Sequence, residues 1–144
     1  MTGVRTIGLL SALAVAAACG SSTGPAASDL VGTWHATRMQ YVSTTGLGTV
    51  DIVAAGGTVT LVLNADSTYQ LTVTPSGGSP DVSAGTWSNS IDVMTVRETG
   101  MTGEMQFQMT YTATTLTLTG ANTSYDFNGD GTEEAATLNV TFTR

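Results

Sequence analysis

The chain has 144 residues, enough for one domain, and its eleven acidic residues against four arginines and no lysine give a formal net charge of −7. A chain this acidic cannot build the basic face that neutralises phosphates, which excludes nucleic acid and anionic lipid headgroups as electrostatic partners. Threonine is the most frequent residue, with 28 copies, and its stiff β-branched side chain favours strands, so the composition predicts an all-β body.

Residues 1–18 have the three-part pattern of a secretory signal peptide. Arg5 supplies the positive charge, and the apolar run over residues 7–15 is too short for a membrane span, which needs roughly 20 residues. The run ends in Ala16-Ala17-Ala18-Cys19-Gly20, which resembles the bacterial lipobox, in which small residues precede a lipidated cysteine. An ordinary signal peptide with a chance cysteine is the alternative.

The resemblance implies that Cys19, the only cysteine, becomes the new N-terminus and carries acyl chains such as palmitate. The protein is then a lipoprotein of the bacterial cell envelope, held at the membrane by this anchor. Gly20 implies the outer membrane or its periplasmic face in a Gram-negative cell. The Gly/Ser/Pro-rich segment after Cys19 predicts a flexible tether over residues 19–28, so the folded domain is expected over residues 29–144.

The body alternates between apolar and polar residues in short segments, which is typical of strands. Strands are expected over residues 33–42, 58–63, 68–74, 82–88, 91–97 and 104–112, around 116–118, and over 136–142, with Asn89-Ser90 as a hairpin turn. Residues 43–57 contain four glycines, and residues 50–55 within them are expected to form a short helical turn or a lid. No helical stretch is long enough for a parallel crossover. The predicted fold is therefore a small antiparallel up-and-down barrel of about eight strands, with a β-sandwich as the alternative.

Leu30-Val31-Gly32-Thr33-Trp34 resembles the Gly-x-Trp opening of lipocalins and their calycin relatives, and Ala84-Gly85-Thr86-Trp87 repeats it. In those families the tryptophan closes the barrel floor and an arginine near the last strand covers it. The resemblance implies that Arg144 lies over Trp34 as a cation–π partner. The chain departs from typical lipocalins in being shorter and in lacking the cysteines for their disulfide.

The same resemblance implies a lipocalin-like barrel that binds a small hydrophobic ligand. Trp34 and Arg144 would form the floor of the pocket, and its lining would comprise Tyr69, Leu71, Met105, Phe107, Met109 and Tyr111. The alternative is that these side chains fill the barrel, because eight strands leave an interior just wide enough for them. The protein would then be a structural or interaction lipoprotein that contacts an envelope protein, or an accessory subunit or inhibitor of an exported enzyme.

An acidic loop follows Tyr125. Asp126, Asn128 and Asp130 match the opening of a calcium-binding loop, whose oxygen ligands suit this hard cation. Thr137 stands where that loop carries a bidentate glutamate, and Glu133 or Glu134 could substitute for it. The alternative, which we favour, is a hairpin built from Asn-Gly and Asp-Gly turns, with no metal.

Catalysis has little basis in the sequence. His35 is the only histidine, it falls on the polar face of its strand, and the sequence pairs it with no nucleophile. We therefore expect no enzymatic activity, and no cofactor apart from the candidate calcium.

Overall fold

The computed structural model describes residues 24–144, so Cys19 and the predicted signal peptide lie outside the described residues. A short helix precedes nine strands. In chain order the elements are α1 (Ala27–Leu30), β1 (Gly32–Ser43), β2 (Thr49–Asp51), β3 (Thr58–Leu63), β4 (Thr68–Thr74), β5 (Asp81–Ser90), β6 (Val93–Glu98), β7 (Met105–Tyr111), β8 (Thr115–Tyr125) and β9 (Glu134–Thr143).

The strands form one closed antiparallel barrel. Each strand from β3 to β8 pairs with the next along the chain, β1 pairs with β3, and β1 also pairs with β9 and so closes an eight-stranded ring. β2 is an additional short strand on the second half of β1, where Gln40 lies opposite Asp51. The predicted all-β barrel is confirmed, because the first and last strands meet along residues 35–43 of β1.

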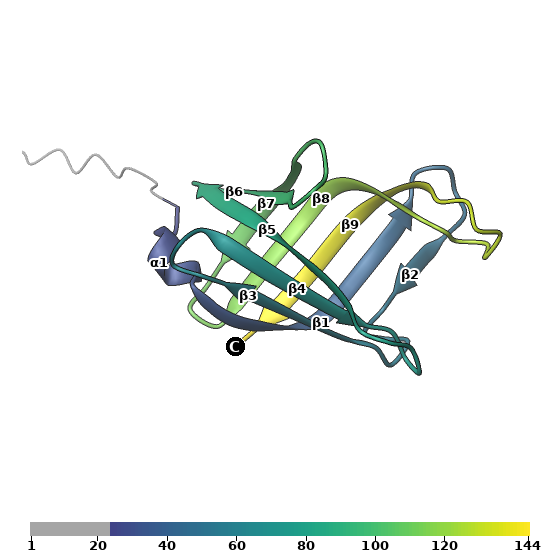
Figure 1. Cartoon of the computed structure of the whole chain (residues 1–144), viewed down its shortest axis with the longest axis horizontal. Helices are drawn as coiled ribbons and strands as arrows, with labels where there is room; N and C mark the ends of the chain where they lie inside the picture. Colours follow the sequence, from purple (N-terminus) through teal and green to yellow (C-terminus); the bar gives the residue numbers. More distant parts are fainter. Residues whose placement is uncertain (1–23) are drawn as a thin grey trace, which may run out of the picture.

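The two ends of the barrel differ (Figure 1). The closed end carries α1, the C-terminus and the short β3–β4, β5–β6 and β7–β8 turns. The open end carries the loops β1–β2, β4–β5, β6–β7 and β8–β9, of which β8–β9 extends far beyond the barrel wall. Among residues 24–144, no helix has the length and apolar character to cross a bilayer.

Trp34 plugs the closed end. Its side chain has no solvent exposure, and its indole nitrogen donates a hydrogen bond to the carbonyl oxygen of Leu30 at 2.8 Å. The Arg144 guanidinium carbon lies 4.2 Å from the centre of the Trp34 ring, and the Tyr111 ring meets that ring edge-on at 6.3 Å. The predicted contact between Arg144 and Trp34 is confirmed.

Arg144 also ties three segments of the closed end together. Its guanidinium donates to the carbonyl oxygens of Asp29, Val31 and Ala113 at 2.9, 3.2 and 3.0 Å. It donates further to the Tyr111 hydroxyl at 3.2 Å, and that hydroxyl donates to Asp29. The arginine therefore joins the entry to β1, the turn between β7 and β8, and the end of β9.

The second Gly-Thr-Trp sequence has a related role on β5. Trp87 is buried, and its indole nitrogen donates to the carbonyl oxygen of Asn64 in the β3–β4 turn at 3.3 Å. A Cβ atom on Gly85 would lie 1.9 Å from the carbonyl oxygen of Arg97. Glycine is therefore needed where β5 and β6 approach each other closely.

The predicted hairpin turn at Asn89-Ser90 is wrong. Both residues belong to β5, Ser90 pairs with Val93, and the turn consists of Ile91 and Asp92. The Asn89 amide donates instead to the carbonyl oxygen of Pro25 at 2.8 Å, which fastens the incoming chain to the closed end. Asn89 thus makes a long-range contact and does not form the turn. Ile91 is the turn residue with a positive φ, of 42°.

Candidate ligand-binding site

The inward-facing side chains leave a hollow within the core of the barrel. This cavity has a volume of about 70 Å³. Its lining comprises Met39, Val59, Leu61, Leu63, Tyr69, Leu71, Ser83, Met94, Val96, Glu98, Met105, Phe107, Leu118, Leu138, Val140 and Phe142. Strand alternation explains the set, because residues two apart on each strand point to the same face.

Four of the eight predicted pocket residues line this cavity, namely Tyr69, Leu71, Met105 and Phe107. The others, Trp34, Met109, Tyr111 and Arg144, are not part of its lining. Trp34 and Met109 are buried and face inward, and Tyr111 and Arg144 contact each other at the closed end. The structure thus divides the predicted set into a cavity wall and a floor below it.

Several residues of the cavity lining were not predicted from the sequence. Met94 and Glu98 belong to β6, whose expected range began at residue 91 and stopped at residue 97. Met94, Val96 and Glu98 are spaced two residues apart on one strand, and this spacing could have predicted that all three face inward. Met39 was missed because a bulge between Ala36 and Arg38 shifts the alternation of β1.

The cavity is small compared with typical ligand sites. Sites for drug-sized molecules measure about 300–1,000 Å³, and a cavity of about 150 Å³ holds benzene. Three lining residues, Met39, Met94 and Met105, are methionines, whose flexible side chains adapt to an incoming group. A second hollow of about 180 Å³ lies at the β6–β7 loop and shares Val96, Glu98 and Met105 with the cavity.

Polar side chains enter the cavity wall at one place. Tyr69 is nearly buried, whereas Ser83 and Glu98 are half-buried at the ends of their strands. Burial raises the pKa of the Tyr69 phenol, the negative charge of Glu98 raises it further, and a side-chain hydrogen bond with Ser83 acts in the opposite direction. These three residues therefore form one interacting polar group in a wall that is otherwise apolar.

Aromatic side chains border the open end beside β8. The Tyr41 and Tyr125 rings stack with centres 4.6 Å apart, and Phe127 meets Tyr125 edge-on at 5.2 Å. Burial raises the pKa of Tyr41, and the charges of Tyr125, Asp81 and Glu133 add to this effect. The cluster holds the base of the long β8–β9 loop against β1.

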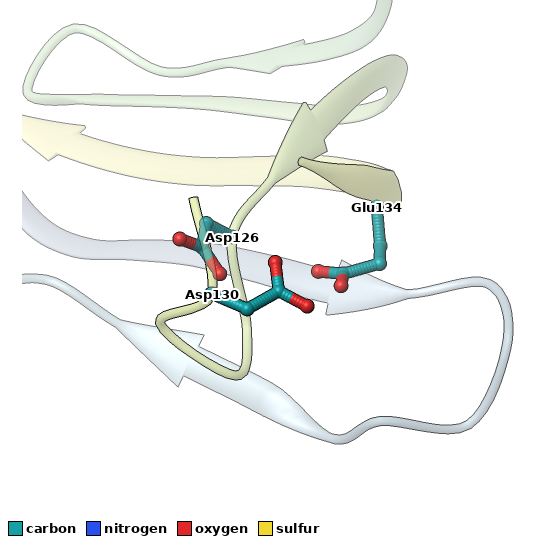
Figure 2. Close-up of side chains that lie close together, drawn as sticks. All are labelled: Asp126, Asp130 and Glu134. Atoms are coloured by element: carbon teal, nitrogen blue, oxygen red, sulfur yellow. The ribbon is translucent and has the colours of Figure 1, made fainter. Parts of the chain in front are cut away.

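The acidic loop brings together most of its predicted ligands. Carboxylate oxygens of Asp126, Asp130 and Glu134 lie within 4.8 Å of one another, and Figure 2 shows the Asp130 and Glu134 carboxylates facing each other. The Asn128 amide nitrogen donates to Asp130 at 3.0 Å and to Glu134 at 3.1 Å. Glu133 lies apart and accepts a hydrogen bond from the Ser124 hydroxyl.

Backbone amides also fold this loop onto its carboxylates. Asp126 accepts hydrogen bonds from the amides of Gly129 and Gly131 at 2.7 and 2.9 Å. Hydrogen bonds from Thr132, and a further one from Asn128, lower the pKa of Asp130. The arrangement offers three carboxylates to a cation, and the same groups serve as acceptors in a tight hairpin turn.

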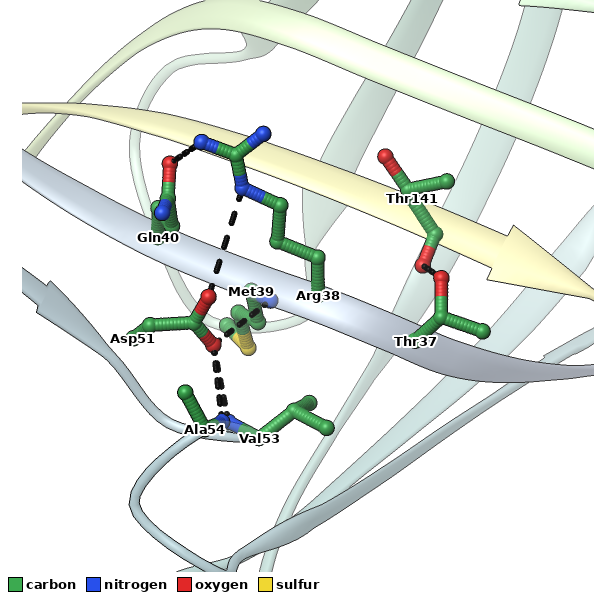
Figure 3. Close-up of polar contacts among 8 residues, drawn as sticks. All are labelled: Thr37, Arg38, Met39, Gln40, Asp51, Val53, Ala54 and Thr141. Carbon is green, nitrogen blue, oxygen red and sulfur yellow. Dashed lines mark hydrogen bonds and ion pairs between the residues drawn. The ribbon is translucent and has the colours of Figure 1, made fainter.

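The segment between β1 and β3 packs against the barrel core through Ile52 and Val53. Residues 51–56 form the predicted helical turn, in which the Ala55 amide donates to the Asp51 carbonyl at 3.0 Å, whereas the short strand β2 before it was not predicted. Figure 3 shows the Asp51 carboxylate accepting from the amides of Val53 and Ala54, at 3.0 and 3.1 Å, with Arg38 at 4.0 Å. Burial raises the pKa of Asp51, but these amides and that of Met39 outweigh it, and the pKa lies below its usual value.

His35 makes one side-chain contact in the described part of the chain, to the Thr60 hydroxyl at 3.4 Å. His35 is exposed on the outer face of β1, where its strand parity placed it.

The family model described as a lipocalin-like domain matches residues 30–118, more than half of the chain. No curated protein matches the chain. Among solved structures, the chain is similar to a designed protein described as "De novo design of a fluorescence-activating beta barrel". The two share 11% identity, with a TM-score of 0.42, over 82% of this chain and 95% of that chain.

Proposed function

The chain belongs to the lipocalin-like domain family, and from that premise we propose that it is a lipid-anchored envelope lipoprotein whose barrel binds a small hydrophobic ligand. The observation that carries the ligand proposal is the cavity of about 70 Å³, which has an apolar wall and a few polar groups at one place. Ligand sites in barrels commonly combine these two features. No catalytic role is proposed for His35 or any other residue, and no cofactor is proposed.

The lipid anchor is supported by the lipobox-like sequence around Cys19, which lies outside the described residues. The described chain enters the fold at the closed end, where Pro25 accepts a hydrogen bond from Asn89. The five residue steps from Cys19 to Gly24 span at most about 18 Å. A lipidated Cys19 would therefore hold the closed end near the membrane and leave the open end free to receive a ligand from the aqueous side.

Methionine methyl NMR provides a site-specific test of ligand binding. Hexanol, a small uncharged ligand, is titrated into protein with labelled methionine methyl groups. We expect saturable shifts at Met39, Met94 and Met105, which line the cavity.

Two tryptophan variants of β4 serve as a matched pair. Leu71→Trp places an indole in the cavity and is expected to abolish the shifts, whereas Gln70→Trp on the exposed outer face should preserve them. If wild-type protein shows no saturable shift, the ligand proposal fails. The structural or interaction lipoprotein with a filled core, which the small cavity volume favours as the second candidate, would then replace it.

The anchor has its own test. Metabolic labelling with palmitate in a bacterial host is expected to mark the protein, and Cys19→Ala should abolish both the label and the recovery of the protein with membranes. A labelled Cys19→Ala variant, or an unlabelled wild-type protein, would contradict the lipidation proposal. Neither outcome affects the ligand proposal.

A further inference from the structure

The cavity wall contains one charged side chain, that of Glu98. All but three of the sixteen lining residues are apolar, and the three are Tyr69, Ser83 and Glu98. Glu98 also borders the second hollow at the β6–β7 loop.

The strand register brings these three residues to one face. Tyr69 pairs with Gly85 on β5, and Gly85 pairs with Glu98 on β6, so the three positions form one row across the sheet. Because Gly85 has no side chain, β5 places nothing between Tyr69 and Glu98 in this row. Ser83 lies two residues before Gly85 and faces the same way. In this row the negative charge of Glu98 adds to burial in raising the pKa of the Tyr69 phenol.

Glu98 belongs to no ion pair within residues 24–144. The two ion pairs of this part of the chain are Arg38–Asp51 and Arg97–Glu104. A half-buried carboxylate beside an apolar hollow favours a partner of opposite charge, because water screens it less there than at an open surface.

The charges around the open end of the barrel also favour a cationic partner for Glu98. Seven of the eleven acidic residues lie in or beside the loops of the open end, namely Asp81, Glu98, Glu104, Asp126, Asp130, Glu133 and Glu134. Arg97 precedes Glu98 on β6, and its guanidinium is held 2.7 Å from Glu104. The resulting negative potential attracts cations to the cavity entrance and repels anions.

We propose that the cavity selects amphiphiles whose polar end is a cation, such as a primary ammonium group, and discriminates against those that end in a carboxylate. The ammonium would lie at Glu98, within reach of Tyr69 and Ser83, and the apolar chain would extend among the methionines. A charge-assisted hydrogen bond to Glu98 supplies the preference, and a carboxylate at the same place meets like charge. This inference rests on the proposed ligand binding and specifies its ligand class.

Hexylammonium, hexanoate and hexanol share one chain and differ in charge, so their comparison tests the inference directly. Dissociation constants are measured at low ionic strength from the methyl shifts of Met39 and Met94. We expect hexylammonium to bind at least about tenfold more tightly than hexanoate, with hexanol between them. Glu98→Gln should reduce this ratio to about threefold or less.

Glu133→Gln is the matched control, because it removes one carboxylate from the open end at a residue that does not line the cavity. The control should keep most of the wild-type ratio. If wild-type protein binds hexanoate as tightly as hexylammonium or more tightly, the charge inference is overturned and the ligand proposal remains intact. The same conclusion follows if Glu98→Gln and Glu133→Gln reduce the binding ratio equally. Failure of all three ligands to bind overturns both. The wild-type ranking decides the question even if Glu98→Gln does not fold.

Discussion

Replacing Arg144 with alanine tests whether the closed end depends on this residue. The guanidinium makes three hydrogen bonds to carbonyl oxygens, at 2.9–3.2 Å, and covers Trp34 at 4.2 Å. A charged donor contributes about 1.5–3 kcal/mol per hydrogen bond, and a cation–π contact at an exposed site adds about 0.5–1 kcal/mol. Because Arg144 is exposed, water weakens each hydrogen bond, and we expect a total loss of about 2–3 kcal/mol in the free energy of unfolding.

Thermal unfolding followed by circular dichroism measures this loss. For a domain of this size the expected fall in Tm is about 6–15 °C. Arg144→Lys keeps the charge but loses the planar fork of donors, so at least half of the fall should remain. The control Arg97→Ala removes an exposed arginine whose surface ion pair with Glu104 contributes at most about 1 kcal/mol. A fall for Arg144→Ala no larger than that for Arg97→Ala would refute the reasoning and show that Arg144 frays.

Three further outcomes are expected. Gly85→Ala places a Cβ 1.9 Å from the carbonyl oxygen of Arg97, so β5 and β6 must separate, and the urea midpoint should record a loss of about 2–3 kcal/mol. Because the pKa of Asp51 is lowered in the folded state, the ionised carboxylate stabilises the fold fully above about pH 4, and this stabilisation is lost as the pH falls through the folded-state pKa. Asp51→Asn should therefore show a smaller decline of Tm in acid than the wild-type protein. Calorimetry with millimolar calcium should give no heat, because the loop's own donors already serve Asp126, Asp130 and Glu134, whereas heat that disappears in Asp130→Asn would establish a calcium site.

The closed end was the most predictable part of the molecule. Period-two alternation fixes which residues face inward, and a closed antiparallel sheet is the arrangement that removes both edges. The alternating pattern places Trp34 and Arg144 on the inward face of β1 and at the end of β9, both at the closed end of the barrel. Their contact therefore follows from the topology. The strand boundaries mostly agree with those expected because turn residues such as Asn64 and Pro75 separate the alternating segments.

The cavity was harder to predict, because alternation assigns a residue to a face but not to a height in the barrel. Met109 faces inward as expected, yet it is not part of the cavity lining. Glu98 was missed because a charged residue at a strand end is usually exposed, and its inward position depends on β6 continuing one residue beyond its expected end. The turn at Ile91-Asp92 was missed because the contact from Asn89 to Pro25 is long-range and leaves no local pattern.

The closed wall limits how the cavity can admit a ligand. Its eight strands are hydrogen-bonded in an unbroken ring, so the barrel cannot widen without losing strand pairs. The cavity can therefore enlarge only by rotation of flexible side chains. Three methionines with such side chains, Met39, Met94 and Met105, line it. The second hollow, at the β6–β7 loop, shares Glu98 with the cavity. In the proposed binding mode a thin ligand would bring its polar end beside this carboxylate, so the size limit and the charge preference would arise from the same part of the wall.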